Sequence, residues 1–258
     1  MRAGLRHVRP IAYAIHAASL VLAMLARMRD CAMRALALYL VQPVKSPAPE
    51  ASADPHSLAA VLDRGDVLLT DGNTRCAALV RRLTGSTWSH VSMYVGPLEQ
   101  AADPLCIVEA DLAAGVRPIR LSELNARRVR VLRPVALNDV DRHHVAEWVV
   151  GRIGSDYDVE HAWSLARQAL SRRLTARLLP VPATTAKSAT RFICSTLVAR
   201  AFMLAGYPIM PLDVSPTHDG FDQVNVTPAD FESAPVFAVA WPPADAQGPS
   251  PVVVARKP

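Results

Sequence analysis

The chain has 258 residues, of which 51% are hydrophobic and 20% charged, and its formal net charge is +5. A chain of this length folds as one domain with additions or as two small domains, and it buries a core without needing disulfides. Residues 1–45 carry seven basic residues against Asp30 alone, which leaves 21 basic and 22 acidic residues for the rest of the chain. Because a nucleic-acid-binding domain carries its basic excess on the folded part, we expect no nucleic-acid partner.

An apolar run lies near the start of the chain. Residues 11–26, IAYAIHAASLVLAMLA, have no formal charge and follow the basic stretch MRAGLRHVRP. The run is shorter than the roughly 20 residues that cross a bilayer as a helix, and no clear cleavage site follows it. We predict that residues 1–42 associate with a membrane surface, with the inner membrane as the expected location and its side left open. A cleavable signal and a helix that caps the folded domain are the alternatives.

Residues 43–57, PVKSPAPEASADPHS, are rich in Pro, Ala and Ser and are predicted to form a linker before a catalytic domain over 58–258. Hydrophobic periodicity and turn signals predict strands over 67–69, 91–95, 105–110, 115–119, 129–132 and 237–241. Helices are predicted over 57–62, 74–83, 121–126, 138–153, 159–170 and 192–206, with Thr74 and Asn138 as N-caps. This order predicts an α+β fold in which helices pack on an antiparallel sheet.

The cysteines are Cys31, Cys76, Cys106 and Cys194. They form no C-x-x-C pair and no His/Cys spacing typical of a metal site, so we expect free thiols, most of them small core residues. The adjacent pair His143-His144 falls on a predicted exposed helix, and adjacent residues do not share a helix face. The sequence therefore indicates no metal and no cofactor.

Cys194 is the candidate nucleophile. In RFICSTLVARAF it falls in the first turn of a predicted amphipathic helix, where the positive helix end and unpaired N–H groups favour the thiolate. The thiolate is the attacking species, and the same N–H groups are suited to hold an oxyanion. A small buried residue is the alternative interpretation of this cysteine. Cys76 also lies near a predicted helix start and competes for the reactive role.

His90 and Glu109 are the candidate partners of that thiol. His90 begins the strand in TWSHVSMYVG, and histidine is the side chain that titrates near neutral pH. Glu109, in IVEAD on the next strand, is placed to fix the tautomer of His90 and to stabilise the imidazolium. Asp111 is the competing carboxylate, two residues further along the same face. A structural histidine and a solvated carboxylate remain the alternatives.

Four stretches occur in a characteristic order: GDVLL at 65–69, WSHVSMYVG at 88–96, VEA at 108–110 and CSTLV at 194–198. Together they resemble the YiiX/YebB-like branch of the NlpC-type cysteine hydrolases, in which a papain-like fold is circularly permuted so that the His strand precedes the Cys helix. The resemblance covers roughly residues 58–242. The N-terminal apolar segment and the basic loop 171–190, just before the nucleophile, depart from the family core.

The resemblance implies roles for particular residues. Cys194 matches the nucleophile, His90 the base and Glu109 the carboxylate that orients it. Gly154-x-x-Tyr157-Asp158 is similar to the family's G-x-x-Y-D stretch, so Tyr157 is expected to line the cleft, a buried packing role being the alternative. Two further residues of the His motif, Trp88 and Ser89, are also predicted to contact substrate.

The expected activity is hydrolysis of an amide bond, in a peptide or cell-wall-type substrate, through an acyl-enzyme. A lipid-directed thioesterase or acyltransferase of the same fold is the second hypothesis, since the N-terminus is apolar. A non-catalytic module that binds an acylated partner at the membrane is the third.

Overall fold

The computed structural model describes residues 23–25, 27–28, 31–32, 35–44, 54–125, 127–157, 191–210 and 226–242. Outside these residues lie most of the apolar run 11–26, the greater part of the predicted linker, the predicted helix 159–170 and the loop 171–190.

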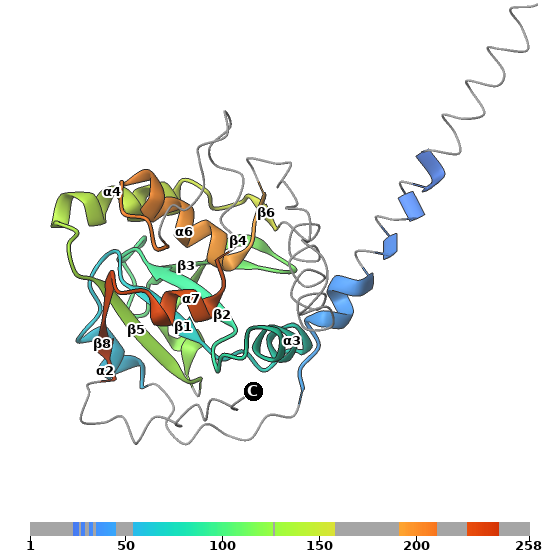
Figure 1. Ribbon diagram of the computed structural model, residues 1–258, viewed down its shortest axis with the longest axis horizontal. Helices are drawn as coiled ribbons and strands as arrows, with labels where there is room; N and C mark the ends of the chain where they lie inside the picture. The colour runs from blue at the N-terminus through green and yellow to red at the C-terminus, as the bar shows by residue number, and fades with distance from the viewer. Residues whose placement is uncertain are drawn as a thin grey trace, which may run out of the picture.

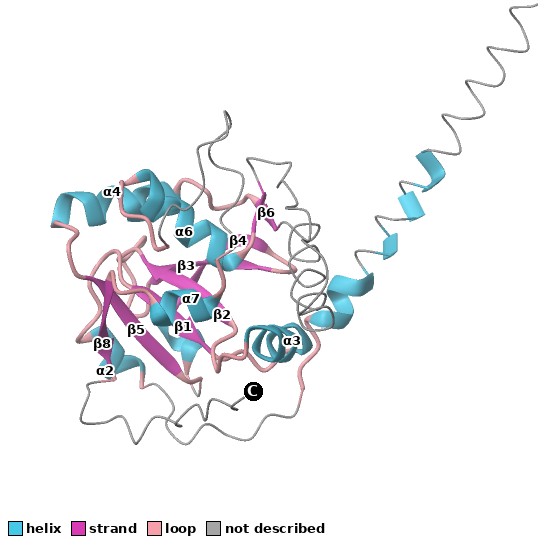
Figure 2. Ribbon diagram, in the orientation of Figure 1, coloured by secondary structure: helices cyan, strands magenta, loops and turns pink. Residues whose placement is uncertain are grey.

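A six-stranded antiparallel sheet in the order β4-β3-β2-β1-β5-β8 forms the centre of the domain (Figures 1 and 2). Its strands are β1 Val67–Thr70, β2 His90–Tyr94, β3 Leu105–Asp111, β4 Gly115–Arg120, β5 Val129–Pro134 and β8 Phe237–Trp241. Strands β3 and β4 form a hairpin. The predicted α+β architecture is therefore confirmed.

The helices are α2 Pro55–Ala59, α3 Arg75–Thr84, η1 Leu121–Leu124, α4 Asp139–Val150, α6 Cys194–Leu204 and α7 Pro228–Ser233. The two predicted caps are confirmed, since Thr74 Oγ1 accepts from Ala77 N–H at 3.1 Å and Asn138 Oδ1 from Asp141 N–H at 2.9 Å. Two strands of two residues, β6 Asp156–Tyr157 and β7 Arg191–Phe192, pair in parallel. The sequence did not predict them because so short a pair carries no periodicity.

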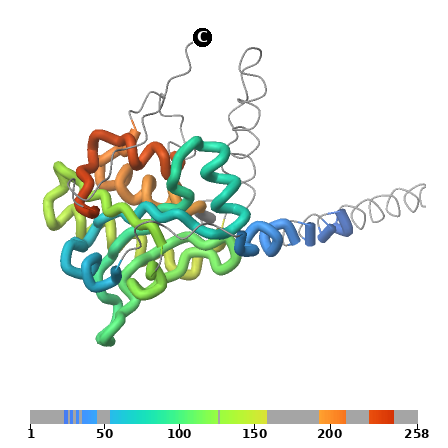
Figure 3. The backbone as a smooth tube through the Cα atoms, turned by 90° about the horizontal axis from the view of Figure 1, so that it is seen from below, coloured from blue at the N-terminus to red at the C-terminus, as the bar shows by residue number. Residues whose placement is uncertain are grey.

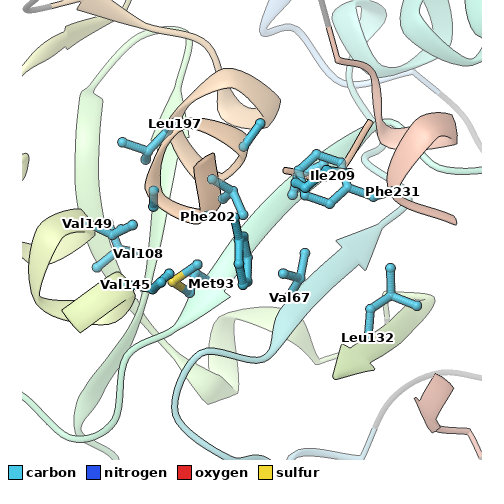
Figure 4. Packing of buried hydrophobic residues seen from close by; sticks show 14 of the residues in the cluster. Val67, Met93, Val108, Leu132, Val145, Val149, Leu197, Phe202, Ile209 and Phe231 are labelled. Atoms are coloured by element: carbon cyan, nitrogen blue, oxygen red, sulfur yellow. The ribbon is translucent and has the colours of Figure 1, made fainter. Parts of the chain in front are cut away.

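Both faces of the sheet are covered, and each carries a hydrophobic core. Val67 and Leu69 of β1 point to the side of α4 and α6, where Val149 and Phe202 pack with them (Figure 4). Leu68 points to the other side, into a cluster that includes residues of α2 and η1. Because successive side chains of a strand face opposite sides, burial on both sides accounts for the unbroken apolar run of β1.

The described residues before the domain are attached at the start of α3. Val44 N–H donates to the Asn73 carbonyl at 2.7 Å, and Arg75 N–H donates to the Gln42 carbonyl at 3.0 Å. The Arg75 guanidinium also lies 4.1 Å from the ring centre of Tyr39. Residues 35–40 are helical and leave the domain beside α3 (Figure 3). No described helix is both long and apolar enough to cross a bilayer.

Candidate active site

Cys194 is the first residue of α6. Strand β7 leads into it, and the helix then packs against β2 and β3. Thr196 stabilises this entry, since its hydroxyl accepts from Ile193 N–H at 3.1 Å and lies 3.1 Å from the Ile193 carbonyl. The N–H groups of the first turn have no carbonyl one turn earlier to bond, so they point toward acceptors around the thiol.

The strands beside Cys194 separate at this end of the sheet. The β2–β3 ladder runs from Tyr94 and Ile107 to Ser92 and Glu109, and it stops there. Val95 N–H of the chain after β2 donates to the Cys106 carbonyl of β3. Because N–H groups alternate in direction along a strand, Val91 N–H points to the same side as Val95 N–H. At Val91, however, the ladder with β3 has already ended. Instead of a β3 carbonyl, Val91 N–H bonds the sulfur of Cys194, as does Ser195 N–H. The thiol therefore lies where the two strands diverge.

His90 links Cys194 to Glu109. His90 Nε2 lies 2.9 Å from Glu109 Oε2, and the ring also forms a hydrogen bond with Cys194. With Nε2 facing the carboxylate, Nδ1 is the ring nitrogen left for the sulfur. The histidine is about one-fifth exposed, whereas the glutamate side chain is nearly buried.

The electrostatics of this group favour an ion pair. Burial alone raises the pKa of Cys194, but the positive His90 and the N–H donors outweigh it, so the pKa of the thiol lies below its usual value. Burial likewise lowers the pKa of His90, but the Cys194 thiolate and Glu109 outweigh that effect and raise the pKa. The two groups titrate as a pair, in which the thiolate and the imidazolium each stabilise the charged form of the other.

Arg117 is a residue that the sequence analysis missed. Its Nε and Nη2 both donate to Glu109 Oε1, at 3.0 Å and 2.7 Å. Burial raises the pKa of Glu109, but His90 and Arg117 together lower it to about 2. The register of the hairpin places Arg117 directly opposite Glu109, and this register was the signal that a residue-by-residue analysis did not use.

Two competing residues have other roles in the structure. Asp111 Oδ1 accepts from Ala113 N–H and Ala114 N–H at 2.9 Å and 2.8 Å, and so caps the β3–β4 turn. Cys76 is partly buried, and burial, with the charges of Cys194 and Asp111, raises its pKa to about 11. A thiol with that pKa is protonated, and therefore unreactive, near neutral pH.

The three predicted substrate contacts differ in their surroundings. Ser89 is buried, and its hydroxyl accepts from Gly72 N–H at 2.8 Å. Trp88 is a core residue whose ring lies 5.2 Å from the Arg130 guanidinium. Tyr157 is partly buried and pairs with Phe192, two residues before Cys194. Among these three residues, Tyr157 is the one whose strand, β6, pairs with the strand that leads into Cys194. A substrate contact for each of the three stays a prediction.

All four cysteines are free, but only Cys106 is fully buried, and Cys31 is exposed on the N-terminal helical segment, away from either core. The expectation of mostly buried cysteines is therefore wrong. Among the described residues, no His, Cys, Asp or Glu cluster has the geometry of a metal site.

A cysteine at the head of a helix, paired with a histidine from a strand that comes earlier in the chain, defines a cysteine hydrolase of the permuted papain-like class. Residues 61–172 match the family Peptidase_C92, described as permuted papain-like amidase enzymes, YaeF/YiiX. The match confirms the resemblance to the YiiX/YebB-like branch, the fold and the cysteine-hydrolase, amidase-like class of this enzyme. The matched range includes His90 and Glu109 and ends before Cys194.

One solved structure similar to this chain is that of the metalloprotein yiiX from Escherichia coli O157:H7. It shares 17% sequence identity with a TM-score of 0.48, and the comparison covers 69% of this chain and 96% of that chain. No curated protein matches this chain.

Proposed function

We propose that the protein hydrolyses an amide bond in a peptide or cell-wall-type substrate, with Cys194 as nucleophile, His90 as general acid and base, and Glu109 as the carboxylate that orients His90. The observation that carries the proposal is the continuous hydrogen-bonded series from the Cys194 sulfur through the His90 ring to Glu109. A buried, hydrogen-bonded carboxylate holds an imidazole in one tautomer and stabilises its protonated form.

The proposed cycle has two steps. The Cys194 thiolate adds to the amide carbon, the C–N bond breaks as the His90 imidazolium protonates the leaving amine, and an acyl thioester remains. Neutral His90 then takes a proton from water, whose oxygen adds to the thioester, and departure of the thiolate releases a carboxylic acid product. The N–H groups of the first turn of α6 supply donors for the oxyanion of each step.

The test is the pH dependence of iodoacetamide labelling, mapped by mass spectrometry on wild type, Cys194→Ala and His90→Ala. We expect Cys194 to label well below the usual thiol pKa of about 8.5, and to lose this reactivity in His90→Ala. Cys76 is an internal control, since its pKa is raised to about 11. Equal labelling rates for Cys194 and Cys76 near neutral pH would contradict the proposal.

Association with a membrane surface is part of the proposal. Met24, Leu25, Met28 and Leu38 are exposed apolar residues of the N-terminal segment. Residues 1–45 also carry the basic excess of the chain, which suits an anionic lipid surface. An exposed apolar surface flanked by basic residues is typical of helices that lie in a membrane interface.

The attachment of this segment supports a second candidate, a thioesterase or acyltransferase acting on a lipid-borne acyl group. Val44 bonds the Asn73 carbonyl, and Gly72 of the same loop bonds Ser89, which precedes His90. One short loop therefore separates the membrane-directed segment from the His strand. A panel of acyl thioesters and γ-linked peptides, tested on the full chain with and without vesicles, separates the two: turnover of the esters alone would exclude the amidase.

A further inference from the structure

We propose that Arg117 is a positioning residue of this site, which keeps Glu109 ionised and fixes the orientation of its carboxylate, and which acts on His90 only through Glu109. The inference rests on the proposed function, because it takes Cys194 and His90 as the reacting pair.

Each oxygen of the Glu109 carboxylate bonds a different partner, Arg117 or His90. Glu109 and Arg117 are directly opposite in the β3–β4 ladder, so their side chains leave the same face of the sheet. Two guanidinium nitrogens of Arg117 hold Oε1, while His90 Nε2 bonds Oε2 at 2.9 Å. A rotation of the carboxylate away from His90 therefore breaks the contacts with Arg117 as well, so Arg117 restrains the acceptor of the His90 ring.

The charge of Arg117 has a role that His90 cannot fill. The Glu109 side chain is 6% exposed, and a buried carboxylate needs a cation nearby to remain ionised. In the proposed cycle His90 becomes neutral when it protonates the leaving amine, whereas a guanidinium stays charged throughout. Arg117 thus keeps Glu109 ionised during the part of the cycle in which His90 carries no charge, and the proton passes between His90, amine and water without transfer to Glu109.

Two substitutions separate the charge of Arg117 from its geometry. In Arg117→Met we expect kcat to fall about tenfold with little change in KM, because Glu109 loses the partner that positions it; about tenfold is the lower end of the loss seen when an outer partner of a metal-site ligand is removed. The low-pH limit of Cys194 labelling moves to higher pH, because a Glu109 that is less firmly held as a carboxylate stabilises the His90 imidazolium less, and that imidazolium is the cation that favours the thiolate. In Arg117→Lys the charge remains but the paired donors are lost, so the low-pH limit stays near that of wild type while kcat is still reduced.

Arg120→Met is the matched control. Arg120 lies on the same strand, its side chain is 38% exposed against 40% for Arg117, and it pairs with Glu99 at 2.8 Å. We expect wild-type kcat and an unchanged labelling profile for this variant. Thermal unfolding of every variant identifies any loss that comes from misfolding.

The background Glu109→Gln tests whether Arg117 acts through Glu109. There, Arg117→Met should cause no further loss of kcat. An equal loss in both backgrounds, or wild-type kcat and labelling in Arg117→Met, would overturn the inference. The proposed function fails separately, if wild-type Cys194 shows no enhanced reactivity; a reactive Cys194 that is indifferent to Arg117→Met removes only the role of Arg117.

Discussion

Glu109 is the residue on which the electrostatics of the site depend. It lies between an imidazole and a guanidinium in a buried setting, and these two partners hold its pKa at about 2, below the ordinary value of 4.5. A carboxyl whose pKa is lower in the folded than in the unfolded protein stabilises the fold fully above its unfolded pKa. That contribution is lost as pH falls from about 4.5 toward 2.

We therefore predict that wild type loses stability more steeply than Glu109→Gln between pH 4.5 and pH 2. The free energies of unfolding, measured by urea titration across this range, should converge as Glu109 is protonated in the wild type. Glu123→Gln is the control, because Glu123 is 42% exposed and lies 3.9 Å from Arg117. Parallel pH curves for wild type and Glu109→Gln would show that Glu109 is not the group responsible.

Strand β1 is held at its start by a buried ion pair. Gly65 takes a φ of +86°, which favours glycine, and its N–H donates to the Tyr94 carbonyl at 2.9 Å. The fully buried Asp66 accepts from Arg133 Nε and Nη2 at 3.0 Å and 2.7 Å. The Gly65-Asp66 pair of the motif GDVLL therefore fixes the start of β1 to the end of β5, away from the reacting groups.

We predict that Arg133→Met lowers the free energy of unfolding by about 3–5 kcal/mol, because it leaves the charge of Asp66 buried without its partner. Asp63→Asn should cost less than about 1 kcal/mol, since Asp63 is 60% exposed and pairs with the same arginine at 3.0 Å. Urea unfolding at pH 7 measures both. Similar losses in the two variants would mean that burial of Asp66 is not what makes the pair important.

Across the whole molecule, the N-terminal segment and the catalytic domain meet at the start of α3. Residues 39–44 contact the loop and helix start at 73–75 through two backbone hydrogen bonds and the stacking of Arg75 on Tyr39. A membrane-bound segment attached in this way would hold the domain at the lipid surface with the His strand one loop away.

We predict that the full chain co-sediments with anionic vesicles and that the triple substitution Met24→Gln, Leu25→Gln and Met28→Gln weakens binding at least about tenfold. Loss of three apolar side chains removes several times the ~1.4 kcal/mol that a tenfold change requires. The control replaces two equally exposed apolar residues of the domain, Val135→Gln with Val140→Gln, which are 61% and 63% exposed. Equal loss of binding in both variants would contradict a specific role for the N-terminal segment.

Local patterns determined much of the fold. The caps Thr74 and Asn138, the alternation of Val91 and Met93, and the unbroken run of β1 depend on interactions within a few residues or on burial of one face or both. Such signals predict the elements, though less well their ends: the helix predicted to reach residue 153 stops at Val150, where Gly151 follows. The sequence did not predict the two-residue strands β6 and β7, because each forms only by pairing with the other, more than 30 residues away in the chain.

For the site, the sequence determined the residue types: a cysteine at a helix start, a histidine that begins a strand and a carboxylate on the next strand. It left Glu109 and Asp111 as alternatives and missed Arg117, because strand register is a tertiary property. Only the folded chain ends the β2–β3 ladder at Ser92 and Glu109 and brings Val91 N–H to the sulfur of Cys194. The physical reason is that the lowered pKa of Cys194 arises mainly from His90, with Val91 N–H beside it, and both lie about 100 residues away in the chain, at distances that local periodicity does not encode.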